Sequence, residues 1–222
     1  MFTGGTLKYP GMLSNHAVHE LLEPYGLDLS DDQVEKVLIY LNLLLRWNKK
    51  INLTAIRTPE ECITRHFAES FLLSKTIPLA GSLMDVGSGA GFPGLALKIL
   101  SPKMTVLLLE PVGKKRAFLK EVVNVCGLGS ISAVGATIQD FSRQHASEPF
   151  DVVTIRAVGK LTDLIPRAID CLKASGHLCL WIGSDQAEDI LGSELQVQWK
   201  DPISIPFTLK RQILVGTKLY IS

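Results

Sequence analysis

The sequence has few cysteines and no cysteine pattern. Its 222 residues include four, at Cys62, Cys126, Cys171 and Cys179. No two of them form a CxxC pair or a regular framework, so we expect neither a disulfide scaffold nor a cysteine-based zinc site. The one close histidine pair, His16 and His19, is expected to have no cysteine or acidic partner, and we therefore expect no bound metal.

Long apolar segments are also missing. The most apolar helical stretch, Leu38 to Leu45, is interrupted by Asn42 and is far shorter than the roughly 20 residues that span a bilayer. The first twenty residues contain no basic start followed by an apolar stretch, which argues against a secretory signal. The sequence therefore predicts a cytoplasmic protein with no membrane partner.

A strong excess of one charge is missing as well. The chain has 23 basic and 22 acidic side chains, a formal net charge of +1. The charges are nevertheless segregated: residues 20 to 35 carry only acidic ones, residues 46 to 66 are mostly basic, and a second basic cluster contains Lys114, Lys115, Arg116 and Lys120. Such clusters occur both on RNA-binding surfaces and on solvated helix faces, and charge alone does not decide between them.

The composition changes along the chain and predicts three parts. Residues 1–14, rich in Gly and Thr, are predicted to be a flexible tail. Residues 15–79 are predicted to form an N-terminal helical subdomain, in which Ser30 and Gln33 make a capping box and Thr58-Pro59 begins a further helix. Residues 80–222 are predicted to form a Rossmann-like domain.

From Leu83 onward, strand-like and helical segments alternate. Seven strands are predicted, at residues 83–86, 105–109, 131–134, 150–155, 177–182, 196–205 and 212–219. This alternation predicts an α/β fold with a mainly parallel sheet and helices on both faces. Ligands of such sheets bind beyond the carboxyl ends of the strands, which is where we expect the site.

The most informative segment is the glycine-rich stretch Gly87-Ser88-Gly89-Ala90-Gly91-Phe92-Pro93-Gly94. It follows a predicted strand and precedes the helical run from Leu95 to Leu100. Glycines permit a sharp turn and let a ligand approach the backbone N–H groups, and the helix start presents further unpaired donors. We therefore expect a nucleotide-like cofactor.

Two acidic residues bear on the choice of cofactor, because Gly89-x-Gly91-x-x-Gly94 also fits the dinucleotide fingerprint. Asp85 ends the first predicted strand, where a carboxylate suits the ammonium and sulfonium of S-adenosylmethionine and would repel a pyrophosphate. Glu110 ends the next strand, where an acid can accept the ribose hydroxyls of either cofactor. Taken singly, Asp85 is equally well a capping aspartate and Glu110 a surface acid; their joint position favours a functional site.

Five segments carry motifs that are specific in combination: Asn52-Leu53-Thr54, Arg65-His66-Phe67-Ala68-Glu69-Ser70, Asp85 to Gly94, Lys114-Lys115-Arg116-Ala117-Phe118-Leu119 and Arg156-Ala157. Together they resemble the glucose-inhibited division protein B family, the small-subunit ribosomal RNA guanine-N7 methyltransferases. The resemblance extends from about residue 20 to the C-terminus.

This resemblance implies a class I methyltransferase fold with a helical N-terminal extension and S-adenosylmethionine as cofactor. It also implies a monomer whose partner is 16S ribosomal RNA or the small ribosomal subunit. Carried over position by position, the cofactor contacts of the family fall on Gly87, Phe92, Glu110, Ile138, Gln139 and Arg156.

The chain departs from the family pattern at several positions. Gln139 stands where the family usually has glutamate beside the adenine, so that Asp140 is an alternative contact. Glu69 replaces an aspartate, and Ile182 replaces a lysine that follows the fifth strand. If that lysine assists RNA binding, Lys160 can substitute for it.

The absent motifs agree with methylation of guanine N7. The fourth predicted strand is followed by no Asn-Pro-Pro-Tyr or Asp-Pro-Pro-Tyr motif, which holds exocyclic amines, and no cysteine precedes a proline. Guanine N7 has a free lone pair and carries no proton, so alignment is the main requirement. Arg156 is expected to place substrate against cofactor, with a structural salt bridge at the strand end as the alternative, and no residue is assigned as catalytic.

Six residues are candidates for RNA contact: Asn52, Arg65, His66, Lys114, Lys115 and Arg116. For His66, which can stack on a base or contact a phosphate, a packed core position is an equal alternative. Two other functions stay open at this stage. One is a nicotinamide-dependent oxidoreductase, and the other is a non-catalytic RNA-binding or assembly protein.

Overall fold

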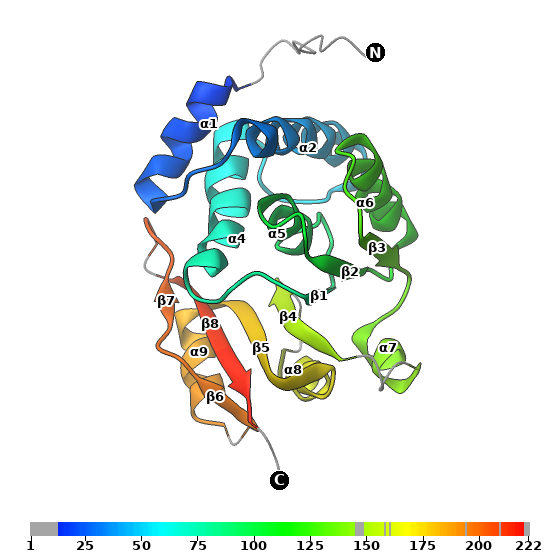
Figure 1. The fold of residues 1–222 in the computed structure, drawn as a ribbon, viewed down its shortest axis with the longest axis vertical. Helices are drawn as coiled ribbons and strands as arrows, with labels where there is room; N and C mark the ends of the chain where they lie inside the picture. The colour runs from blue at the N-terminus through cyan, green and yellow to red at the C-terminus, as the bar shows by residue number, and fades with distance from the viewer. Residues whose placement is uncertain are drawn as a thin grey trace.

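The computed structural model describes residues 13–144, 149–157, 159, 161–193, 195–208 and 210–219. Within them, a sheet lies between two layers of helices (Figure 1). The strands are β1 (Ser82–Val86), β2 (Thr105–Leu109), β3 (Ile131–Val134), β4 (Phe150–Arg156), β5 (Leu172–Gly183), β6 (Val197–Trp199), β7 (Ile203–Ser204) and β8 (Arg211–Lys218).

The helical segments comprise α-helices and short 3₁₀ or π-helical turns. They are α1 (Asn15–Leu22), η1 (Glu23–Tyr25), α2 (Asp31–Ile51), α3 (Pro59–Cys62), η2 (Ile63–Ala68), α4 (Glu69–Phe71), η3 (Leu72–Lys75), α5 (Gly94–Leu100), α6 (Gly113–Val125), α7 (Ile138–Gln144), α8 (Leu161–Asp170) and α9 (Ser184–Leu191).

The sheet has the order β3-β2-β1-β4-β5-β8-β6, with β7 paired to β8. Strands β1 to β5 run parallel to one another, and β8 is antiparallel to β5. The chain passes from β1 to β2 and β3 on one side and then returns to β4 on the other, so the strand order reverses at β1. Ligands of doubly wound sheets bind at such a reversal, beyond the carboxyl ends of the strands.

One apolar core joins the N-terminal helices to the sheet. Leu44 of α2 and Phe67 of η2 belong to the same buried cluster as Val106 of β2 and Val152 of β4. A second cluster lies on the opposite face, where α7, α8 and α9 cover the strands. The N-terminal helices therefore support one face of the sheet directly.

The predicted helix starts are confirmed, and one of them also ties two helices together. Ser30 Oγ accepts from the Gln33 N–H at 3.4 Å and Gln33 Oε1 accepts from the Ser30 N–H at 2.9 Å, which completes the capping box. The Gln33 side chain also donates to the Leu100 carbonyl at the end of α5, at 2.9 Å. Thr58 Oγ1 caps α3 by accepting from the Glu61 N–H at 3.3 Å. This helix then continues through the π-helical turn η2, which the sequence did not predict.

Three predicted boundaries are wrong. The strand predicted at 196–205 is split into β6 and β7, because Pro202 between them has no N–H to donate to a ladder, so the sheet has eight strands in place of seven. Strand β5 begins at Leu172, well before 177. Ser14, assigned to the flexible tail, caps α1 by accepting from the Ala17 N–H at 3.1 Å; residues 1–12 of that tail lie outside the described residues.

Among the described residues, no helix combines the length and the apolar character that crossing a membrane requires.

Candidate functional site

The glycine loop joins β1 to α5 and rests on the N-terminal helices. Gly87, Gly89 and Gly91 have φ angles of 68°, 53° and 93°, a region that residues with a Cβ rarely adopt. A Cβ at Gly91 would collide with the Tyr40 hydroxyl of α2, which donates to the Ala90 carbonyl. A Cβ at Gly89 would meet only the Gly87 carbonyl oxygen, at 3.7 Å. The loop therefore packs against α2 at Gly91, whereas the space beside Gly89 is open.

Glu110 lies immediately after β2 and is bound to this loop. Its Oε2 accepts from the Gly89 N–H and its Oε1 from the Val112 N–H, both at 2.8 Å. The side chain is only 3% exposed. A carboxylate oxygen has about two acceptor sites, so each oxygen retains one for a ligand hydroxyl. The predicted position of Glu110 beside the glycine loop is therefore confirmed.

Asp85 lies beneath the loop and not on its surface. It is 1% exposed, and its Oδ1 accepts from the Thr154 hydroxyl of β4 at 2.7 Å. A Cβ at Gly94 would come within 2.8 Å of Oδ2, so only glycine fits above it. Burial raises the pKa of Asp85 to about 6. The carboxylate can thus favour a bound cation through its electric field, but it does not present an oxygen at the surface.

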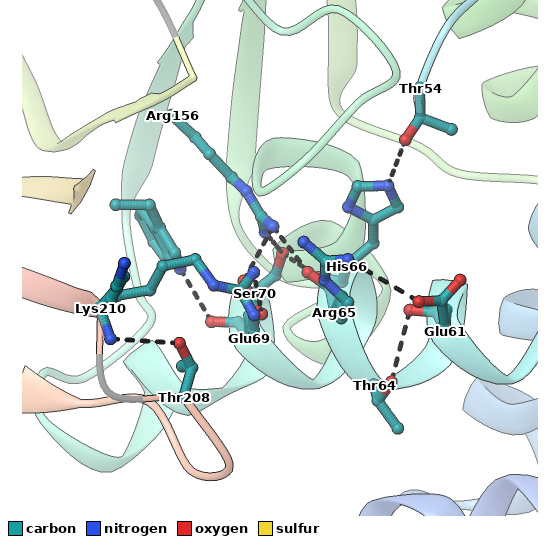
Figure 2. Close-up of polar contacts among 12 residues, drawn as sticks. Thr54, Glu61, Thr64, Arg65, His66, Glu69, Ser70, Arg156, Thr208 and Lys210 are labelled. Carbon is teal, nitrogen blue, oxygen red and sulfur yellow. Dashed lines mark hydrogen bonds and ion pairs between the residues drawn. The ribbon is translucent and has the colours of Figure 1, made fainter. Parts of the chain in front are cut away.

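Arg156, at the end of β4, belongs to a group that we call the ion cluster, together with Glu69 and Arg211. Figure 2 shows Arg156 pointing toward Glu69. Glu69 is 3% exposed; its Oε2 lies 2.9 Å from Arg156 Nη2, and its Oε1 lies 2.6 Å from Arg211 Nη1. Burial raises the pKa of the Glu69 carboxyl, and the two guanidiniums oppose that rise. One carboxylate therefore orients two cations.

Two further contacts of Arg156 reach the same helical segment. Its Nη2 also donates to the Arg65 carbonyl at 2.6 Å, and its Nη1 lies 3.5 Å from the Ser70 hydroxyl (Figure 2). The carbonyl of Glu69 accepts from the indole N–H of Trp181 at 2.9 Å, so the ion cluster is also hydrogen-bonded to β5. The sequence predicted Arg156 and noted Glu69, but missed Arg211 and Trp181.

His66 stacks on the glycine loop. Its ring lies 4.6 Å from that of Phe92 at an angle of 15°, and Phe92 in turn stacks on Tyr40 at 5.1 Å and 8°. His66 Nε2 is 2.7 Å from Thr54 Oγ1 (Figure 2). Burial, followed by the charge of Arg156, lowers the pKa of His66 to about 3. The ring is neutral at pH 7 and is packed against Phe92, as the alternative of a packed position predicts, whereas its contact with RNA stays a prediction.

Asn48, which the sequence analysis missed, shapes the segment that holds His66. It is 3% exposed near the end of α2, where its side chain accepts from the Thr54 N–H at 2.9 Å and donates to the Thr54 carbonyl at 2.9 Å. The one sign of this role in the sequence is that Asn48 is an amide residue within an apolar helical stretch. Asn52 is exposed and ends α2 with a φ of 48°, a conformation that asparagine tolerates better than most residues.

The three basic candidates on α6 lie differently. Lys114 is exposed and Lys115 half-buried, whereas Arg116 Nη1 donates to the carbonyls of Glu110 and Pro111 at 2.9 and 2.7 Å. Arg116 therefore supports the turn that holds Glu110. The first turn of α6 has no acidic residue, although a helix start favours anions. Lys114 therefore lies at a helix start, where the helix dipole does not stabilise a positive charge.

The residues predicted to contact the adenine begin α7. Ile138 is 1% exposed and packs in the second core, and Gln139 beside it is half-buried. Asp140, the alternative contact, accepts from the Thr137 hydroxyl at 2.7 Å and faces its own helix start. Of the two polar candidates, Asp140 is therefore engaged in a capping hydrogen bond, and the Gln139 side chain is not, within the part of the chain that the structure describes.

The structure does not place a lysine at the end of β5. Ile182 is 7% exposed and packs in the second core, opposite Gln212 of β8. Lys160, suggested as a substitute, lies outside the described residues. Arg211, opposite Gly183, instead brings a cation to this end of the sheet.

One expectation about the N-terminal histidines is wrong. His16 Nε2 lies 3.4 Å from Glu20, and His19 Nδ1 lies 3.8 Å from Asp28, so both have acidic partners on the surface. Within the described part of the chain, no group of three or more His, Cys, Asp or Glu side chains could hold a metal ion.

The chain was compared with known proteins. The family model described as rRNA small subunit methyltransferase G matches residues 33–214. The ribosomal RNA small subunit methyltransferase G of Desulfitobacterium hafniense (strain Y51) is 41% identical over 170 residues, which cover 76% of this chain and 71% of that protein. The protein of the same name from Roseiflexus sp. (strain RS-1) is 36% identical over 205 residues, covering 88% of this chain and 87% of that one.

A solved structure shows the same fold. The ribosomal protein L11 methylase from Lactobacillus delbrueckii subsp. bulgaricus matches with a TM-score of 0.59 over 70% of this chain and 79% of that one, at 17% identity. At this identity the likeness concerns the fold alone, and it confirms the predicted class I methyltransferase fold with its central sheet.

Proposed function

The chain belongs to the ribosomal RNA small subunit methyltransferase G family, and from this premise we propose that it transfers the methyl group of S-adenosylmethionine to N7 of a guanine in 16S ribosomal RNA. The curated relatives reported above are named as methyltransferases, which argues against the nicotinamide-dependent and non-catalytic alternatives. The cytoplasmic location, the monomeric state and the division into a helical subdomain and a Rossmann-like domain stay predictions.

One observation carries the proposal: the glycine loop is tied to the carboxylate that follows β2. The bond from the Gly89 N–H to Glu110 places acceptor atoms beside a stretch of loop where only glycine has the required φ. The free acceptor sites of Glu110 suit the two hydroxyls of a ribose. Gly87 and Phe92 border the same loop, and Gln139 lies at the start of α7, where its amide oxygen can accept from an exocyclic amine. These residues fit S-adenosylmethionine.

The cofactor would supply a methyl group activated by the positive sulfonium. On the protein side, Asp85 provides a buried negative charge beneath the loop, with its Oδ2 lacking a hydrogen-bond partner among the described residues. A field from a fixed carboxylate in a dry site is stronger than it would be in water. Asp85 therefore favours a cationic ligand above the loop without touching it.

The target guanine needs orientation more than proton transfer, because its N7 lone pair is free at neutral pH. Methylation moves positive charge onto the guanine ring, and a nearby uncompensated cation would oppose this. The structure limits that cost in two ways. Glu69 offsets part of the positive charge that Arg156 and Arg211 bring to the site, and His66 remains neutral. We assign these residues to alignment of the base and not to acid–base catalysis.

Cations at this edge of the sheet would meet the RNA backbone. Lys114 and Arg65 are exposed, and their positive charges complement phosphate. Asn52 and Lys115 stay candidates for the same contact, whereas Arg116 is occupied by the turn after β2.

The decisive experiment supplies the purified chain with radiolabelled S-adenosylmethionine and small ribosomal subunits from cells that lack the enzyme. We expect label in 16S RNA, and mass spectrometry should locate it at N7 of one guanine. Calorimetry should show binding of the demethylated cofactor and none of NAD. Label on another atom of the base would refute the N7 assignment, and tighter binding of NAD would refute the cofactor.

A further inference from the structure

An exposed phenylalanine stands at the functional edge of the sheet. Because β8 is antiparallel to β5, its first residue, Arg211, lies opposite Gly183 at the carboxyl end of β5. The loop between β7 and β8 therefore emerges at the same edge as the glycine loop and Arg156. Phe207 of this loop is 79% exposed, the most exposed of the large hydrophobic residues described.

The backbone holds Phe207 outward at a cost. Its φ is 62°, in the left-handed region that a residue with a Cβ rarely adopts. The flanking residues are tied on both sides: the Ile205 N–H donates to the Arg211 carbonyl at 3.3 Å, and the Ser184 N–H donates to the Lys210 carbonyl at 3.1 Å. A strained and exposed aromatic residue that its surroundings hold in place suggests a use for the ring.

Phe207 is braced by a second aromatic ring. It lies 5.5 Å from Tyr25 of η1, edge to face at 74°. Tyr25 is 8% exposed, and its carbonyl accepts from Lys75 Nζ at 2.6 Å, which fixes the segment. The charges of Glu69 and Arg211 both act on the Tyr25 phenol, so the aromatic pair adjoins the ion cluster.

The surroundings of the ring are basic and not apolar. Lys210 and Arg65 are exposed, and Arg211 is 34% exposed, while the carboxylate of Glu69 is buried between two arginines. The acidic Glu61 is 3.8 Å from Arg65. The other exposed large hydrophobic residues of the described chain lie outside this loop, at Val112, Val125, Val134, Leu191 and Leu219. A lone aromatic ring among cations suits a nucleic-acid base better than an apolar protein surface.

We propose that Phe207, braced by Tyr25, is a stacking platform for an unpaired RNA base near the target guanine, with Lys210 and Arg211 beside the adjoining phosphates. The proposal rests on the proposed function, because it takes ribosomal RNA as the substrate. It adds a base contact that no motif of the sequence indicated, and it locates this contact on the far side of Arg156 from the glycine loop.

The test compares Phe207→Leu, which keeps the Cβ and the apolar bulk, with Phe207→Tyr, which keeps the aromatic face. The control is Leu219→Ala, just beyond the other end of β8, where the residue is 46% exposed. The probes are a short fluorescein-labelled oligoadenylate and the same ribose-phosphate chain without bases. Binding is measured by fluorescence anisotropy over a range of salt concentrations.

We expect Phe207→Leu to weaken binding of oligoadenylate by about 5- to 20-fold, the lower part of the range for a single base–aromatic stack. Phe207→Tyr and Leu219→Ala should bind like the native chain. Because no charge is removed, the salt dependence should be the same in all variants. On the abasic probe, native chain and Phe207→Leu should bind equally.

Equal binding of oligoadenylate by Phe207→Leu and native chain would overturn the platform, as would an equal loss on the abasic probe. Normal RNA binding by Phe207→Leu together with slower methylation of intact small subunits would also overturn it, since the ring would then contact a protein. Failure of the proposed function looks different: the native chain would bind oligoadenylate with the expected loss in Phe207→Leu but would transfer no methyl group.

Discussion

The two sides of the functional edge hold their polar groups by different means. On the loop side, Glu110 is fixed by backbone N–H groups of Gly89 and Val112. In the ion cluster, Glu69 is fixed by the side chains of Arg156 and Arg211. A backbone donor is lost only on substitution by proline, whereas a side-chain partner is lost in most substitutions. The loop side should therefore be sensitive to backbone conformation, and the ion cluster to charge balance.

The largest effect is expected on the loop side, from Gly89→Val. Gly89 has a φ of 53°, which a β-branched residue can hardly adopt, so the N–H that binds Glu110 should move. We expect the affinity for S-adenosylhomocysteine, measured by calorimetry, to fall at least about 100-fold.

The matched control is Gly127→Val, in the turn between α6 and β3. Gly127 has a φ of 60° and nothing within 4 Å of an added Cβ, so it carries the same backbone strain away from the loop. Its variant should bind the ligand normally. An equal loss of affinity in both variants would mean that strain alone, and not the loop, is responsible.

The ion cluster should respond most to Glu69→Gln, which leaves two guanidiniums without their carboxylate in a largely buried place. Removal of one member of a buried ion pair costs about 3 kcal/mol or more of unfolding free energy, measured by urea denaturation. Glu69→Asp retains the charge and should cost less. The control Glu61→Gln removes a surface partner of Arg65 and should change stability by less than about 1 kcal/mol. Equal costs at both sites would contradict the charge-balance argument.

The substitution Asp85→Asn removes the negative charge beneath the loop and keeps the shape of the side chain. The pKa of Asp85 is raised to about 6, so the folded chain binds this proton more tightly than the unfolded chain does. Protonation of Asp85 therefore contributes up to roughly 3 kcal/mol, for two pKa units, to the free energy of unfolding. This contribution is complete below about pH 4 and is lost as pH rises through about 6. Urea unfolding at several pH values should show the native chain losing stability relative to Asp85→Asn over this range. A stability difference between the native chain and Asp85→Asn that does not change with pH would contradict this prediction.

The smallest effect is expected from the titration of His66. Its pKa is lowered to about 3, so the ring does not change its charge between about pH 6 and 9. With cofactor and RNA at saturating concentrations, where the effect of Asp85 on cofactor affinity no longer limits the rate, the single-turnover rate of methyl transfer should be flat over that range, in the native chain and in His66→Ala alike. An acidic limb that disappears in His66→Ala would show that the ring takes part in proton transfer.

Sequence patterns failed for more than one physical reason. The π-helical turn η2 contains Arg65 and His66 and has Glu69 as its C-cap, in a helix for which the sequence predicts no such turn. The strand predicted at 196–205 has suitable residues, but Pro202 divides it. Arg116 belongs to a basic cluster in the sequence, and only the structure shows that it holds the turn after β2.

The loop side could be predicted because its parts follow one another in the chain. A strand, glycines with special φ angles and an acid at the end of the next strand are local features, and the parallel register of β1 and β2 then brings Glu110 to Gly89. The ion cluster could not be predicted in this way. Glu69, Arg156 and Arg211 come from a helical turn and two strands far apart in sequence, and Phe207 meets Tyr25 across nearly the whole chain. Such contacts depend on how helices and strands pack, since burial and charge pairing act between neighbours in space.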